Sequence, residues 1–89
     1  MANTRSAEKR MRQGEKRRVR NAAVRSAVRT AVKGTRGTIG AGTVDAARAS
    51  LAHTIRLLDK AVTKGVLHKN AAARRKSRLM RQLNALVAR

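Results

Sequence analysis

Lysine and arginine are the side chains of this sequence that are best equipped to bind a ligand, and they are concentrated in two segments. The 89 residues include 23 Lys plus Arg and four Asp plus Glu, a formal net charge of +19. The segment HKNAAARRKSRLMRQL, residues 68–83, holds six of these cations and no acid. Guanidinium groups bind phosphate oxygens through a planar fork, and ammonium groups bind them as point charges. Because the chain repels itself, we expect a polyanionic partner.

The residues needed for catalysis are scarce. Catalysis requires acids, bases or nucleophiles that converge in one pocket, whereas this chain has four scattered acids, two His and no Cys or Tyr. We therefore expect no enzymatic activity, no cofactor and no metal site. His53 is predicted to be a half-buried packing residue. Two interpretations of His68 stay open, as a cap of a helix or as a contact to phosphate or ribose.

A nucleic acid is one such polyanion, and the absence of Phe, Trp and Tyr limits the ways in which this chain could bind one. Proteins that bind single strands stack the bases on aromatic side chains, and so do RRM domains. Stacking on aromatic rings is impossible here. Recognition must therefore use phosphates, 2′-hydroxyls and the shape of a structured RNA.

Charge divides the chain into three parts. Residues 1–37 carry a net charge of +10, residues 38–65 carry +2, and residues 66–89 carry +7. Glycines mark both boundaries, in the segment 34–42 and at Gly65. No stretch approaches the roughly 20 apolar residues of a membrane span, and the N-terminus lacks the apolar run of a secretory signal. We expect one small, soluble domain over residues 1–89, without a membrane partner.

Apolar residues recur at three- and four-residue steps between residues 44 and 64, which predicts a helix with one buried face. Thr43 fits the N-cap of this helix, and Gly65 fits the left-handed position after its end. Similar patterns predict a third helix over residues 69–87 and a first helix over residues 6–33 with Ser6 as its N-cap. The apolar faces of the second and third helices comprise Val44, Ala47, Leu51, Ile55, Leu58, Val62, Ala72, Leu79, Leu83, Leu86 and Val87.

These patterns predict an all-α fold, a three-helix bundle with a long, basic, protruding first helix. Before Val19 the first helix has one sizeable apolar residue, Met11, so its N-terminal part has no stripe to bury. We expect residues 1–18 to project from the bundle and to be disordered in the free protein. The residues expected at the centre of the bundle are Leu51, Ile55, Leu58, Leu79 and Leu83.

Two segments closely resemble the signature regions of the bacterial ribosomal protein S-twenty family of the small subunit. They are SAEKRMRQGEKRRVRNAAVRSAVRT, residues 6–30, and KGVLHKNAAARRKSRL, residues 64–79. The resemblance implies a cytoplasmic, ribosomal three-helix bundle that binds 16S ribosomal RNA directly, early in subunit assembly. It places the protein near the lower body and the long penultimate helix of that RNA, with few or no direct protein contacts.

The resemblance also implies two strips of RNA-binding residues, carried over by position. The first strip comprises Lys9, Arg10, Arg12, Lys16, Arg17, Arg18, Arg25 and Arg29. The second comprises His68, Lys69, Asn70, Arg74, Arg75, Lys76, Ser77 and Arg78. Arg81 lies on the same polar face of the third helix and is expected to join it.

One alternative function uses the same charge. A histone-like or nucleoid protein would bind duplex DNA through the release of counterions. The sequence lacks a helix-turn-helix pattern, a basic zipper and a zinc-finger spacing, so it offers no reader for a DNA groove.

Overall fold

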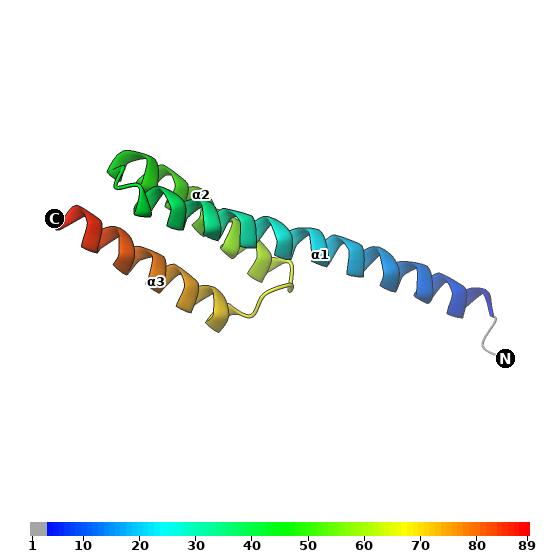
Figure 1. Cartoon of the computed structure of the whole chain (residues 1–89). Helices are drawn as coiled ribbons and strands as arrows, with labels where there is room; N and C mark the ends of the chain where they lie inside the picture. Colours follow the sequence, from blue (N-terminus) through cyan, green and yellow to red (C-terminus); the bar gives the residue numbers. More distant parts are fainter. Residues whose placement is uncertain (1–3) are drawn as a thin grey trace.

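The computed structural model describes residues 4–89 as three helices, α1 (Arg5–Gly40), α2 (Val44–Thr63) and α3 (Lys69–Val87). Successive helices run in opposite directions, so α1 and α3 are parallel (Figure 1). The molecule is elongated, with extents of 65 × 21 × 15 Å. The expected all-α fold with a long first helix is confirmed.

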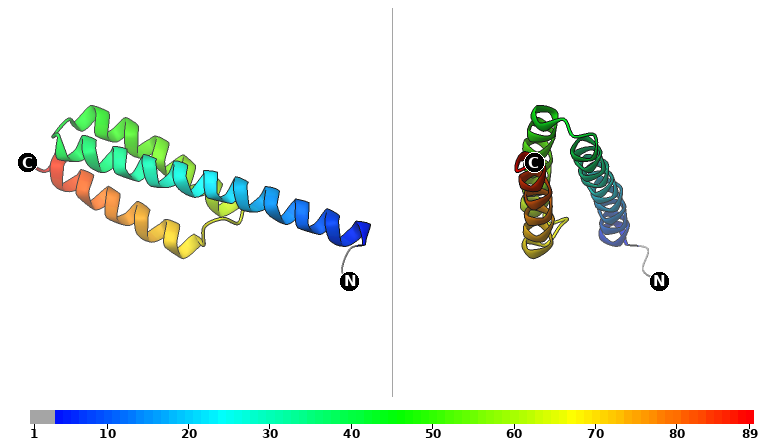
Figure 2. Two further views of the ribbon diagram at one scale, coloured as in Figure 1. Left: turned by 45° about the vertical axis from the view of Figure 1, so that its right-hand side comes forward. Right: turned by 60° about the vertical axis from the view of Figure 1, so that its left-hand side comes forward.

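Helix α1 is much longer than the bundle that it belongs to. Its 36 residues correspond to about 54 Å at 1.5 Å per residue. The N-terminal half extends beyond α2 and α3, so the start of α1 and the end of α3 lie at opposite ends of the described molecule (Figures 1 and 2). The N-cap is Thr4, whose Oγ1 accepts a hydrogen bond from the Ala7 N–H at 3.2 Å, so the prediction of Ser6 was wrong by two residues.

The C-terminal end of α1 also differs from the prediction. The helix does not stop at Lys33 but continues through the glycine-rich segment to Gly40. Val32 and Thr35 are buried and Ile39 is half-buried, and the spacing of these three residues keeps them on one face of the helix. Burial of this face against α2 outweighs the cost of glycine in a helix, about 1 kcal/mol per residue.

The turn between α2 and α3 is a Schellman motif. Gly65 has a φ of +73°, and its N–H donates to the Val62 carbonyl at 3.0 Å. The Val66 N–H donates to the Ala61 carbonyl at 2.9 Å, which completes the paired hydrogen bonds of this motif. The predicted role of Gly65 is confirmed, although α2 ends at Thr63, one residue earlier than expected.

The other helix ends agree with the sequence patterns. Thr43 occupies the N-cap position of α2, but its side chain makes no capping hydrogen bond within residues 4–89. Helix α3 has the bounds that the sequence predicted. Its N-cap is His68, whose Nδ1 accepts from the Asn70 N–H at 3.1 Å.

The core lies where the three apolar faces meet. Leu58 and Leu79 are 0% and 1% exposed, and Leu51 and Leu83 are also buried, as predicted. Ile55 is half-buried and packs against the core. The assignment of Val87 to the apolar face of the third helix was wrong, because its position in the last turn of α3 leaves it 46% exposed.

Within residues 4–89, no helix combines the length and the apolarity that a membrane span requires.

Candidate nucleic-acid interface

A groove runs between the parallel helices α1 and α3. Both helices pack on α2, and their contact with each other is the smallest of the three pairings. In Figure 1 the ribbons of α1 and α3 lie apart from each other, and α2 passes behind α1. Val28 and Val32 of α1 and Leu79 of α3 are apolar residues that line the groove.

The walls of the groove are basic. The cations that line it are Arg25, Arg29, Lys33, Arg36, Arg75 and Arg78. All six side chains belong to exposed residues, and no acid appears among the lining residues. The groove is therefore a strip of positive charge between two helices.

Helical spacing explains why these cations meet. On α1, Arg25, Arg29 and Arg36 follow one another at steps of four and seven residues, which keeps them on one side of the helix. They flank the buried face that contains Val28, so their stems lie against the edge of the core while their heads reach solvent. On α3, Arg75 and Arg78 lie one turn apart in the same way.

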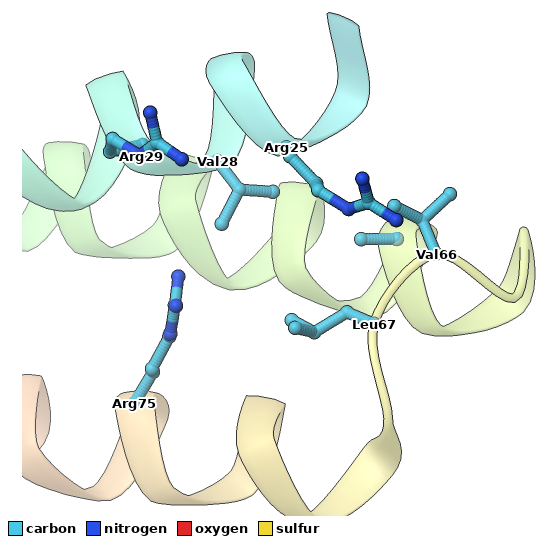
Figure 3. A pocket seen from close by; sticks show the side chains of 7 residues that line it. Arg25, Val28, Arg29, Val66, Leu67 and Arg75 are labelled. Carbon is cyan, nitrogen blue, oxygen red and sulfur yellow. The ribbon is translucent and has the colours of Figure 1, made fainter. Parts of the chain in front are cut away.

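One end of the groove, beside the α2–α3 turn, is a small cavity of about 110 Å³, whereas the remainder of the groove has a volume of about 340 Å³. Figure 3 shows Val28 and Leu67 directed into this space, with Arg25 beside Val66. Arg75 reaches up from α3 toward α1 (Figure 3). The cavity therefore combines an apolar lining with three arginines, the third being Arg29.

The groove brings together four of the predicted site residues, Arg25, Arg29, Arg75 and Arg78. Lys33 and Arg36 were not among the predicted site residues. Arg36 was missed because the first helix was predicted to end at residue 33 and the glycine-marked break to follow it. The step of seven residues from Arg29 to Arg36 was the signal that could have identified it.

Six of the predicted residues lie on the projecting part of α1, away from the groove. They are Lys9, Arg10, Arg12, Lys16, Arg17 and Arg18, and all are exposed. Successive residues of a helix point in directions 100° apart, so these cations surround the helix instead of forming one strip. Met11, in the same segment, is 73% exposed. This N-terminal arm, residues 5–18, therefore has no packing face.

The remaining residues of the second predicted strip lie at different places on α3. Lys69, Asn70, Arg74 and Arg81 are exposed but do not line the groove, and Ser77 is half-buried. The Lys76 Nζ forms an ion pair with the Asp59 Oδ1 at 2.8 Å. This pair links α3 to α2 at a half-exposed position, where such pairs contribute about 0–1 kcal/mol. Lys76 therefore has a structural partner within the chain.

The two histidines have different surroundings. His68 is the N-cap of α3, which agrees with its interpretation as a helix cap. His53 is exposed, so the prediction of half-burial was wrong. It borders a shallow groove on the other side of α1, lined by small residues such as Ala27 and Thr30, and these side chains are too short to cover the imidazole ring.

The family model described as "Ribosomal protein S20" matches residues 2–84. A small ribosomal subunit protein bS20 of Mycobacterium sp. strain JLS is 54% identical over 86 residues, which cover 97% of this chain and all of the relative. The protein of the same name from Shouchella clausii is 51% identical over 88 residues, which cover 99% of this chain and all of the relative.

The similarity extends to distant bacteria. The protein of the same name from Vibrio cholerae is 51% identical over 86 residues, which cover 97% of this chain and all of the relative. The match covers both basic helices and the neutral helix between them. The chain belongs to the ribosomal protein S20 family.

Proposed function

We propose that this chain is a structural constituent of the small ribosomal subunit that binds 16S ribosomal RNA directly through its basic helix faces. The printed names of its relatives, small ribosomal subunit proteins, support the first part. The observation that carries the second part is the acid-free groove between α1 and α3. The protein acts by stabilising the folded RNA during assembly, without catalysis.

The groove suits the phosphate backbone of a folded RNA. Cations face one another across it from two helices, so a strand that enters it has phosphates within reach of both walls. Each arginine can offer two parallel N–H donors to one phosphate. Neutralisation of these phosphates releases counterions, which supplies affinity without sequence readout.

The arm adds a second contact region. Its cations surround the helix, and this arrangement suits a helix that is enclosed by RNA on several sides. If the arm contacted RNA on one side only, its cations would be expected to lie in a single strip. The arm extends the reach of the protein away from the bundle, so one small chain can join RNA segments that are far apart. The nearly neutral helix α2 is expected to face away from the RNA.

Competition binding tests this function. The full-length protein is bound to labelled 16S ribosomal RNA on filters, and unlabelled folded RNA or duplex DNA of equal length is added. We expect the folded RNA to compete far better than the duplex. Equal competition would contradict direct RNA recognition and favour the histone-like alternative.

A further inference from the structure

The cavity at the end of the groove differs from the rest of it. Elsewhere the groove is a strip of cations above the packed apolar residues Val32 and Leu79. Beside the α2–α3 turn the cavity of about 110 Å³ has an apolar lining that includes Ala61, Val66 and Leu67. The apolar residues offer a phosphate no hydrogen bond, so in this cavity only the three arginines could hold one.

The backbone at the turn creates this cavity. The left-handed Gly65 (φ +73°) lets the chain reverse directly after α2. The paired hydrogen bonds then hold Val66 over Ala61, at 2.9 Å between the Val66 N and the Ala61 O. Leu67 follows and enters the space between α1 and α3 (Figure 3). The cavity is therefore a consequence of the same motif that ends α2.

The size and lining of the cavity suit the edge of a flat ring. The cavity of about 110 Å³ is smaller than the apolar cavity of about 150 Å³ that holds a benzene molecule, so it has room for part of a single ring, with the remainder outside it. Arg25, Arg29 and Arg75 lie around it. In the absence of aromatic residues, guanidinium planes are the groups on which an unstacked base can stack.

We propose that this cavity receives the edge of one unpaired nucleobase of the bound RNA, with the ring against Leu67 and Val28 and a face against an arginine plane. The inference rests on the proposed function and adds a base contact to recognition through phosphates. Arginine can contact both parts of a nucleotide, because its charge attracts the phosphate and its guanidinium plane can stack on the base.

Two matched variants test the proposal. Arg25→Lys and Arg36→Lys each keep the charge and lie on the same helix and in the same groove. Arg25 lines the cavity, whereas Arg36 lines only the remainder of the groove. Complexes of the full-length proteins with 16S ribosomal RNA are treated with dimethyl sulfate and carbodiimide, which modify unpaired bases. In the wild-type complex we expect one unpaired base to be protected.

The protection should persist with Arg36→Lys and fall with Arg25→Lys, because lysine has no plane to cover the ring. Replacement of the protected nucleotide by an abasic one should weaken wild-type binding about fivefold or more. The same replacement should have little further effect on Arg25→Lys. This non-additivity would assign the base to the cavity.

Two results would overturn the proposal and leave the proposed function intact. One is RNA binding in which no unpaired base is protected. The other is protection that responds equally to both lysine variants. A wild-type protein that does not bind the RNA would contradict the proposed function itself.

Discussion

The side-chain hydroxyls of Thr35 and Thr54 lie 2.8 Å apart in the interior between α1 and α2, where these residues are 0% and 1% exposed. Thr54 Oγ1 donates its hydrogen to the Ala31 carbonyl at 3.1 Å. A hydroxyl has one hydrogen to give, so Thr35 donates to Thr54, and Ser50 donates to Thr35 across 2.9 Å. This chain of hydrogen bonds fixes the register of α1 on α2, and with it the position of the basic wall of the groove.

Thr54→Val is expected to destabilise the protein. Valine has the shape of threonine but can neither accept from Thr35 nor donate to Ala31, so the buried Thr35 hydroxyl and the half-buried Ala31 carbonyl each lose a partner. The expected loss in free energy of unfolding is about 1–3 kcal/mol. Urea denaturation in high salt, which screens the repulsion between cations, measures it. Thr63→Val is the control, because the Thr63 hydroxyl bonds to the Asp59 carbonyl at an exposed position; equal losses would contradict a role for burial.

Leu58→Ala tests the centre of the core. Leu58 is 0% exposed, and the loss of a fully buried leucine side chain leaves a cavity that costs about 2–5 kcal/mol. The same urea titration measures the change. Val87→Ala is the control, since Val87 is 46% exposed. A cost of a few tenths of a kcal/mol for Leu58→Ala would remove this residue from the core.

The elements that the sequence predicted well are those with local signals at their ends. The apolar stripe of α2 and the glycine at position 65 required no knowledge of the rest of the chain. The end of α1 could not be found in this way, because local propensity disfavours glycine in a helix. Its helical state depends on Thr35 and Ile39, which are stabilised by contact with a different helix.

The N-terminal arm is expected to exchange its amide hydrogens quickly in the free protein. Residues 5–18 are helical here, in contrast with the disorder expected from their charge, and residues 1–3 of that prediction lie outside the described chain. A helix without tertiary contacts opens readily, because its hydrogen bonds are exposed to water. Native-state exchange should therefore give weak protection at Lys9–Arg18 and strong protection around Leu58.

Addition of 16S ribosomal RNA should raise the protection of the arm. If Lys9–Arg18 are as strongly protected as the core without RNA, the arm is a stable helix by itself and the idea of RNA-dependent order is wrong.

His68 is expected to stabilise the start of α3. The capping hydrogen bond to the Asn70 N–H is lost in His68→Ala, at a cost of about 0.5–2 kcal/mol. His68→Asn should retain stability, because asparagine is a strong N-cap residue. Thermal unfolding of the RNA-free protein compares the two. If both variants lose the same stability, the imidazole contributes through something other than the cap.

The part of the candidate site that could be predicted is the set of cations whose position along a helix places them on its polar face. Arg25, Arg29 and Arg78 could be assigned to polar faces from the sequence pattern, and Arg75 was added by the family resemblance. That the two faces converge on one groove depends on the packing of α1 and α3 on α2, which no local pattern specifies. Lys76 belongs to the second predicted strip, yet it pairs with Asp59, 17 positions away in the chain. A local sequence pattern could not reveal this pairing either.

We expect the groove between α1 and α3 to bind RNA phosphates. Arg29→Ala with Arg78→Ala removes one cation from each wall. Arg48→Ala with Arg56→Ala removes two exposed cations of the nearly neutral helix α2. Each lost phosphate contact should flatten the dependence of log affinity on log salt by just under about one unit.

Filter binding of both double variants to 16S ribosomal RNA across a salt series is the decisive measurement. We expect the groove variant to bind more weakly and with a salt slope that is flatter by about one to two units. The α2 variant should keep the affinity and slope of the wild type. Equal changes in slope for the two variants would contradict phosphate binding by the groove, because total charge would then be sufficient to explain the affinity.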